Sequence, residues 1–325
     1  MSIEHDFYNG EPRMKFLSSQ QIKSSLALIG VTAVLSACGG SSGGDTTTGS
    51  TSSSPLMRSH ATVVTDQQAA PTQTETSGAG SSQASATSSP ASTSDGPAGQ
   101  DAGAYTLTFE DNFDGDLNRN VWNTNRTETA ASSTNYATRD GTLKIWPERG
   151  GSGEFFDRTL DTDGRFSQRY GYFEIDAKLP RGKGVWPAFW LFNQIGERRP
   201  EIDILEAYPG GETPWAAPGP DGVPVATMYA PVVWNDAQNR AGYAKVETPN
   251  LSEDFHRYGV KWEPNRVTFY FDGREVYALD VAVSDPLYMI VDLWYGSASG
   301  EPDGTTPTGE SNAFEVNYVK AWQFK

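Results

Sequence analysis

The sequence is poor in cysteine, histidine and basic residues, and each shortage excludes a class of protein. One Cys among 325 residues rules out a disulfide framework within the chain. Three His residues leave little room for a histidine-based metal site. Lys and Arg total 25 against 41 Asp and Glu, for a formal charge of -16. This balance argues against a nucleic-acid partner, disfavours strongly anionic polymers and leaves neutral polymers open as substrates.

Aromatic residues and turn-forming residues are plentiful. Aromatics make up 12% of the chain, with nine Trp, and there are 33 Gly and 20 Pro. Convincing amphipathic helix patterns are scarce. This composition favours a loop-rich β protein over a helical bundle.

The N-terminal part of the chain resembles an export signal. Two lysines precede an apolar run at 26–35, which is shorter than the ~20 residues that span a bilayer. The sequence Leu-Ser-Ala-Cys at 35–38 resembles a bacterial lipobox, and Cys38 is the single Cys of the chain. An ordinary signal peptide with a chance Cys, or a buried core segment, would leave a similar pattern. We expect a lipoprotein signal over 1–38 with lipidation at Cys38, and Met14 is an alternative start of translation.

A long polar segment separates this signal from the rest of the chain. Residues 39–104 are mostly Ser, Thr, Gly, Ala, Pro and Gln, without aromatic residues. Such a segment cannot bury enough surface to offset the loss of chain entropy. We predict a flexible tether over 39–104 that joins a lipid anchor to one folded domain over 105–325. The predicted location is the cell envelope, as an exported lipoprotein, or the outside of the cell.

Period-two alternation of apolar and polar residues dominates the folded part. It is strict at 173–179 and recurs at 267–271, where Asp-Gly at 272–273 predicts a hairpin turn to a strand at 275–279. Further strands are expected at 258–262 and 314–322. About 220 residues suit one sandwich or barrel domain. The predicted fold is all-β, with two packed antiparallel sheets.

Three acidic residues stand close together in the segment 200–206. Strand alternation places Glu201 and Asp203 on one face, but it would turn Glu206 into the core. A buried, unpaired carboxylate is costly. A β-bulge at 204–205 would return Glu206 to the face of the other two acids.

Acids crowded on one face can hold different protonation states, because like charges raise some of their pKa values. Retaining cleavage of a glycosidic bond requires such a pair: one carboxylate attacks, and a second, about 5–5.5 Å away, gives and takes a proton. A solvent-facing strand whose acids form salt bridges with Arg198 and Arg199 would show the same spacing.

The segment just before these acids, 184–191, contains Trp186 and Trp190. Flat indole rings can form platforms for the faces of sugars. Core packing explains them equally well, and Trp190 alternates with Phe189 and could face inward.

Several blocks of the sequence closely resemble glycoside hydrolase family 16. The resemblance covers about 105–325, and Glu-Ile-Asp-Ile-Leu-Glu at 201–206 is its most specific motif. The other blocks lie at 170–174, 178–190, 255–262 and 269–276. The resemblance implies a two-sheet β-jelly-roll sandwich with a substrate cleft across its concave sheet. It also implies an endo-acting retaining β-glycosidase without a required cofactor, acting on a β-glucan or related extracellular polysaccharide.

The resemblance also assigns roles to individual residues. Glu201 is implied as the nucleophile, Glu206 as the acid/base, and Asp203 as the acid that orients and tunes them. Trp186 matches an aromatic residue that lines the cleft. Many members bind Ca²⁺ through an Asp in the last strand, where this chain has Asn317, so that a structural Ca²⁺ site there is a weaker expectation.

Some positions depart from the family pattern and leave the preferred polysaccharide open. Tyr229 stands where laminarinase-like members usually carry a His, and it is expected to contact substrate in its place. Trp294 and Tyr295 would add aromatic surface to the cleft, together with Trp190. The Pro- and Gly-rich segment 208–224 could form one wall.

Two other functions remain open at this stage. A transglycosylase that remodels cell walls would use the same covalent intermediate, and a non-catalytic glycan-binding sandwich would share the fold. The presence of all three acids favours the enzyme. A monomer is expected, with a membrane contact only through the lipid anchor.

Overall fold

The structure is a computed structural model that describes residues 3–5, 14–16, 96–124, 134–236 and 239–325. The predicted lipid site Cys38 and most of the predicted tether lie outside the described residues, and both stay predictions. The last part of that tether, 96–104, packs on the folded domain, where the Ala98 N–H donates to the Glu174 carboxylate at 3.1 Å. Within the described ranges no helix is long and apolar enough to cross a membrane.

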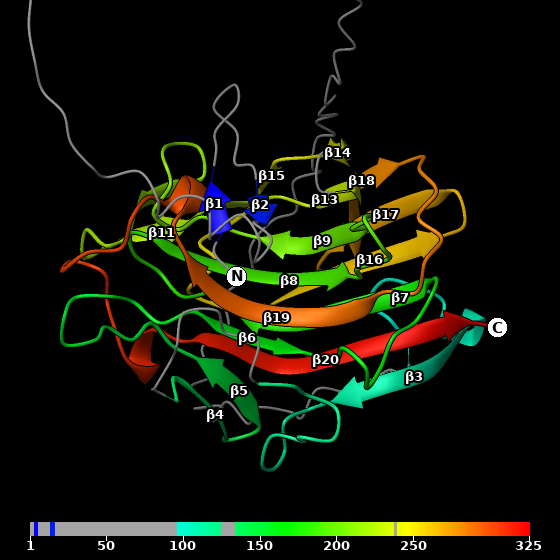
Figure 1. Cartoon of the computed structure of the whole chain (residues 1–325), viewed down its shortest axis with the longest axis horizontal. Helices are drawn as coiled ribbons and strands as arrows, with labels where there is room; N and C mark the ends of the chain where they lie inside the picture. Colours follow the sequence, from blue (N-terminus) through cyan, green and yellow to red (C-terminus); the bar gives the residue numbers. More distant parts are fainter. Residues whose placement is uncertain (1–2, 6–13, 17–95, 125–133, 237–238) are drawn as a thin grey trace, which may run out of the picture. The chain divides into compact units, whose positions relative to one another are not determined.

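Two antiparallel sheets form the folded domain (Figure 1). The six-stranded sheet has the spatial order β14 (Asn239–Tyr243), β13 (Val232–Asp236), β9 (Glu201–Glu206), β8 (Val185–Phe192), β19 (Tyr288–Tyr295) and β6 (Arg158–Asp161). The eight-stranded sheet has the order β18 (Arg274–Leu279), β17 (Arg266–Phe271), β16 (His256–Glu263), β7 (Gly171–Lys178), β20 (Phe314–Phe324), β5 (Thr142–Ile145) and β4 (Tyr136–Arg139), with β3 (Tyr105–Asp111) also paired to β20. The predicted all-β, two-sheet architecture is confirmed.

Short elements complete the chain. The small pairs are β1 (Ile3–His5) with β2 (Met14–Phe16), β10 (Ala216–Pro218) with β11 (Pro224–Ala226), and β12 (Met228–Tyr229) with β15 (Val246–Glu247). Three short 3₁₀ helices are described, η1 (Ala102–Ala104), η2 (Ser297–Ser299) and η3 (Glu310–Asn312). The predicted hairpin between β17 and β18 turns at Asp272 and Gly273, which both have positive φ angles, as a type I′ turn requires.

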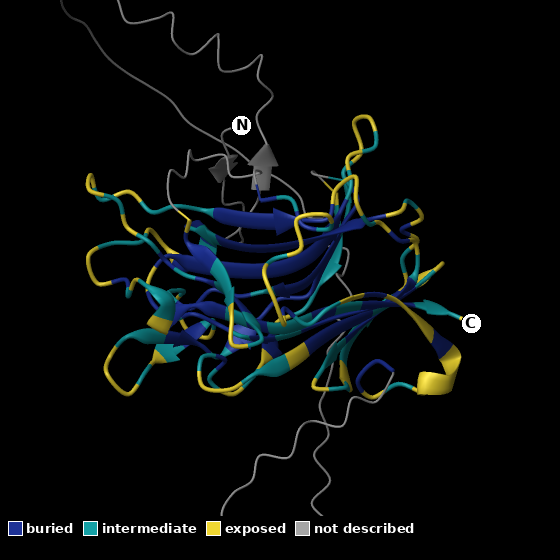
Figure 2. Ribbon diagram, turned by 90° about the horizontal axis from the view of Figure 1, so that it is seen from below, coloured by how far each residue is buried: buried dark blue, intermediate teal, exposed yellow. Residues whose placement is uncertain are grey.

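The core lies between the sheets and follows the period of two. On β7, the side chains of Phe173, Ile175 and Ala177 are fully buried and belong to the main hydrophobic core. On β8, Phe189 and Leu191 point to the same core. Figure 2 shows the buried inner strands between more exposed connecting loops.

The other face of the six-stranded sheet, the cleft face, has a separate apolar cluster. It consists of Ala188, Trp190 and Phe192 on β8 and Tyr288 and Ile290 on β19. Because alternation sends neighbouring residues to opposite faces, the same strands supply both the core and the cleft face.

Candidate active site

The three acids of β9 lie on the cleft face because the strand contains a bulge. Glu201, Asp203 and Glu206 are opposite Phe192, Trp190 and Ala188 of β8, in that order. The register shifts once, and the extra residue is Ile204. Ile204 is 1% exposed and joins the main core. The predicted β-bulge is therefore confirmed, and its effect is to bring Glu206 back beside the other acids.

The burial of these acids excludes a solvent-facing strand decorated with salt bridges. Glu201 is 7% exposed and Asp203 is 6% exposed. Arg198 pairs instead with Asp285, at 2.7 Å. Buried carboxyl groups are costly to ionise, and a strand with a purely structural role would not carry this desolvation cost.

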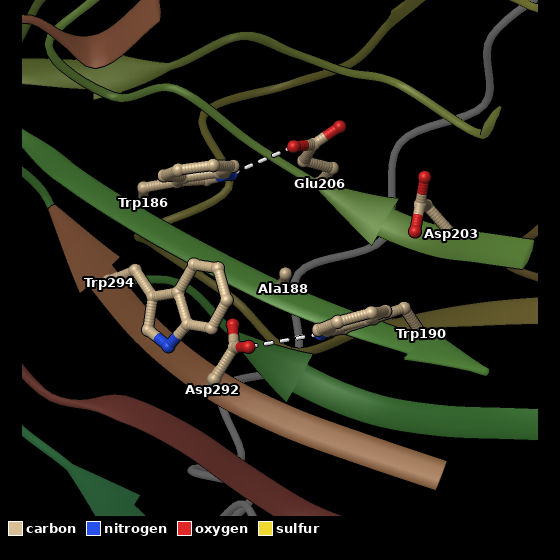
Figure 3. A pocket seen from close by; sticks show the side chains of 7 residues that line it. All are labelled: Trp186, Ala188, Trp190, Asp203, Glu206, Asp292 and Trp294. Carbon is tan, nitrogen blue, oxygen red and sulfur yellow. Dashed lines mark hydrogen bonds between the residues drawn. The ribbon is translucent and has the colours of Figure 1, made fainter. Parts of the chain in front are cut away.

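Three tryptophans line an open pocket together with Asp203 and Glu206 (Figure 3). Trp186, Trp190 and Trp294 contact one another edge to face, with centroids 5.7 Å apart for Trp186 and Trp294 and 6.1 Å apart for Trp190 and Trp294. Trp190 faces the cleft, and Phe189 takes the inward position. The small side chain of Ala188 lies in the middle of the group, which leaves room above β8.

Indole N–H groups tie the tryptophans to carboxyl groups. Trp186 Nε1–H donates to Glu206 Oε1 at 3.0 Å (Figure 3). Trp234 of β13 donates to Asp203 Oδ2 at 3.2 Å. A charge-assisted donor fixes the direction of a carboxyl group as well as its energy. The indoles therefore orient the acids in addition to lining the pocket.

Asp292 is a third carboxyl group that lines the pocket, and the sequence did not single it out. It lies on β19, is 1% exposed and accepts the Trp190 Nε1–H at 3.0 Å. Alternation along 288–295 would have grouped it with Trp294 on one face. The sequence does not show that β19 pairs with β8, and only this pairing brings the face with Asp292 and Trp294 close to the acids of β9.

Burial sets the protonation of the acids. It raises the pKa of Glu201, with a further rise from the charge of Glu206, and a hydrogen bond from Asp203 opposes both. Burial and the two glutamates raise the pKa of Asp203 well above its ordinary value. Burial raises the pKa of Glu206 to about 7, and the neighbouring Tyr208 hydroxyl and the Trp186 N–H act against that rise. The site thus keeps protons on some carboxyls at neutral pH, which general acid catalysis needs.

Tyr229 does not contact the cleft, and its expected role in substrate binding is wrong. It is 0% exposed in the core between the sheets, where its ring packs on Tyr258 and Phe271. Tyr295 also packs against the core, whereas Trp294 lines the pocket. Both differences follow from strand alternation, because one of two adjacent residues must turn inward.

The segment 208–224 begins beside the site and carries the pair β10 and β11. Tyr208 packs against Trp186 with ring centroids 6.0 Å apart, and Trp215 packs on Tyr208 at 5.0 Å. The start of the segment therefore adjoins the Glu206 side of the pocket, as a wall would.

The residues around Asn317 do not fit a calcium site. The Asn317 amide nitrogen donates to Asp176 at 3.1 Å, which turns a donor, and not an oxygen ligand, toward the neighbouring carboxylate. No group of three or more His, Cys, Asp or Glu residues that could hold a metal ion occurs in the described ranges. Ca²⁺ takes six to eight oxygen ligands.

Residues 119–320 match the family model of glycosyl hydrolases family 16. The chain is 31% identical over 213 residues to the endo-1,3-1,4-beta-glycanase EglC of Rhizobium meliloti (strain 1021), covering 62% of this chain and 42% of that protein. It is 30% identical over 267 residues to a glucan endo-1,3-beta-glucosidase of Cryptopygus antarcticus, covering 68% and 93%. The chain thus spans less than half the length of the first relative and nearly all of the second.

Solved structures share the fold. The laminarinase catalytic domain of Thermotoga maritima superposes with a TM-score of 0.56 at 22% identity, covering 68% of this chain and 99% of that one. The endo-beta-1,3-glucanase of Pyrococcus furiosus gives 0.56 at 24%, covering 68% and 95%. These neighbours support the jelly-roll arrangement of the two sheets.

Proposed function

Because the chain belongs to glycosyl hydrolases family 16, we propose that it is an endo-acting β-glucanase that cleaves with retention of configuration. The observation that carries the proposal is the bulge in β9, which gathers Glu201, Asp203 and Glu206 on the face lined by tryptophans. Relatives named for 1,3- and 1,3-1,4-β-glucan cleavage support a β-glucan as the substrate.

The proposed reaction has two steps. Glu201 attacks the anomeric carbon while Glu206 protonates the leaving oxygen, so that one sugar becomes covalently bound to Glu201 and the other chain end leaves. Glu206 then takes a proton from water, whose oxygen displaces Glu201 from the same carbon. One water is consumed, and both carboxyl groups return to their starting states.

Asp203 tunes the pair in this scheme. Its pKa is raised well above the ordinary range by burial and by the two glutamates, so it holds a proton that it can donate to Glu201. That hydrogen bond favours the ionised form of Glu201, the form that attacks. Glu206 must begin the cycle protonated, and the rise of its pKa to about 7 favours that form.

Substitution of either glutamate tests the proposal. Glu206→Gln is expected to lower the rate of reducing-end release from lichenan or laminarin by roughly 10²–10⁴-fold, and Glu201→Gln to lower it to background. Proton NMR of the first-formed product of the wild type should show the β anomer. Wild-type activity in Glu201→Gln, or an α product, would contradict the assignment. Products longer than the substrate would identify a transglycosylase, in which a sugar replaces water.

We also propose that the domain acts outside the cell, tethered through a lipid on Cys38. The lipobox-like sequence at 35–38 and the polar segment that follows it support this proposal. A tether would let an anchored enzyme reach along an extended polymer.

A further inference from the structure

Two loops meet behind Glu206, the turn that follows β9 and the helix η2 that follows β19. The Gly210 N–H donates to Ser299 Oγ at 2.9 Å. A Cβ on Gly210 would lie 2.4 Å from the Ser299 carbonyl oxygen, and one on Gly211 would lie 2.9 Å from the Ala298 carbonyl oxygen. Only glycines allow this close approach, so the two loops are docked tightly against each other.

Tyr208 is held rigidly at this junction. Its side chain is 1% exposed, and its ring lies against Trp186, tilted by 34°, and edge-on to Trp215 at 81°. Its hydroxyl lies next to the Glu206 carboxyl and the Ser297 hydroxyl. In the resting geometry this buried hydroxyl has no well-directed hydrogen-bond partner among the described residues. A buried hydroxyl left in that condition lowers stability, because it has given up its bonds to water without a replacement.

Ser297 shows the same condition from the other loop. It is 9% exposed, and its Oγ is also buried without a partner within the described ranges. Its φ angle is 54°, in the left-handed region that a non-glycine residue occupies at a cost. The unpartnered Ser297 hydroxyl therefore lies next to the Tyr208 hydroxyl, which in turn lies next to a carboxyl group that must both give and take a proton.

We propose that Tyr208 is a positioning residue for Glu206 and that Ser297 completes a hydroxyl relay to it. In this relay Ser297 donates to the Tyr208 oxygen, and the Tyr208 hydroxyl donates to the Glu206 carboxylate. The inference deepens the proposed function, because it rests on Glu206 acting as the acid/base.

The relay explains how Glu206 can perform both halves of the reaction. Once Glu206 has given up its proton, it is a buried anion that needs donors. Trp186 supplies one donor at 3.0 Å, and Tyr208 would supply the second as the charge appears. Both donors stabilise the ionised form and lower the pKa of Glu206, against the rise that burial causes. A pKa near the working pH is what a group that alternates between acid and base requires.

The Trp186 indole offers a direct reporter, since its N–H is bonded to Glu206. In ¹⁵N-labelled full-length protein without substrate, the pH midpoint of the Trp186 indole signal should follow the ionisation of Glu206. The variant Trp186→Phe identifies that signal among the nine tryptophans. Tyr208→Phe is expected to move the midpoint up by about one pH unit, because a hydrogen bond to a charged group is lost. Ser297→Ala should move it in the same direction by less.

Tyr258→Phe is the matched control, since Tyr258 is also fully buried with an unpartnered hydroxyl in the described part of the chain but lies in the core between the sheets. In Tyr258→Phe the pH midpoint of the Trp186 indole signal should equal that of the wild type. An unchanged midpoint in Tyr208→Phe would overturn the relay. If that variant does not fold, Ser297→Ala decides in the same way. The measurement needs no substrate, so a wild type that cleaves no β-glucan refutes the proposed function alone, whereas active enzyme with an unmoved midpoint refutes the relay alone.

Discussion

Glu206 combines two features that conflict, because it must ionise and yet is only partly exposed. Its neighbours Glu201, Asp203 and Asp292 are buried, and the pKa of each is raised by burial first. Each of these groups binds protons more tightly in the folded protein than in the unfolded chain. Stability therefore falls as the pH rises from the ordinary pKa of an acid toward the raised one, and it stays lower above that.

Glu206→Gln should consequently raise stability while it abolishes efficient catalysis. Gln keeps an oxygen that can accept the Trp186 N–H but carries no charge. We expect the variant to exceed the wild type by roughly 1–3 kcal/mol above pH ~7, with the difference vanishing as the pH falls to about 4.5. Thermal unfolding between these limits measures it. Glu275→Gln, at an exposed position of β18, should show no such trend. A stability difference independent of pH would contradict the explanation.

At the scale of elements, the bulge of β9 and the glycines of the turn that follows it both determine the surroundings of Glu206. The bulge restores Glu206 to the cleft face, and Gly210 allows the turn after β9 to dock on η2. Both depend on backbone geometry and not on any reactive side chain. The site is therefore sensitive to changes in residues that never touch a sugar.

Gly210→Ala tests this dependence. The added Cβ would lie 2.4 Å from Ser299 O, 2.6 Å from Lys183 Cα and 2.7 Å from Gly184 N, all of them backbone atoms. We expect a loss of about 1–3 kcal/mol in unfolding free energy and a rise in the Trp186 indole midpoint, as the turn that carries Tyr208 moves away. Gly151→Ala, where no described atom lies within 4 Å, is the control and should behave as the wild type. Equal unfolding free energies of Gly210→Ala and Gly151→Ala would contradict this prediction, because the docked loops would then accommodate the added methyl group without cost.

At the scale of the whole molecule, the charge and the proposed anchor fit the proposal of an enzyme that meets a neutral polymer outside the cell. A formal charge of -16 repels polyanions, and the pocket itself is lined by three of the acids, Asp203, Glu206 and Asp292. A neutral glucan brings hydroxyl donors and no repelling charge to such a surface.

The proposed lipid anchor on Cys38 gives the last prediction. In cells, wild-type protein should sediment with membranes and incorporate labelled fatty acid, whereas Cys38→Ala should do neither, because acyl chains supply the membrane affinity. The control variant Ser41→Ala, in the polar segment that follows Cys38, should remain in the membrane fraction. Membrane association of Cys38→Ala without acylation would refute the lipoprotein assignment and leave the catalytic domain unaffected.

The sequence by itself predicted several of the strands, the two antiparallel sheets, the grouping of the three acids and the bulge at 204–205. These features are local, because side-chain alternation and the spacing of carboxylates along one strand can be read residue by residue. The flanking tryptophans were recognised too, although alternation alone did not decide that Trp190 faces the cleft.

Only the tertiary structure decided which distant residues join that strand. Asp292 is hydrogen-bonded to Trp190 across 102 positions, Trp234 reaches Asp203 across 31, and Gly210 in the turn after β9 donates to Ser299 in η2. Tyr229 also lies on a strand, but its side chain turns into the core and not toward the cleft. Strand order and loop docking result from the packing of the whole chain, so no local pattern specifies them, and the environment of Glu206 is set by that packing.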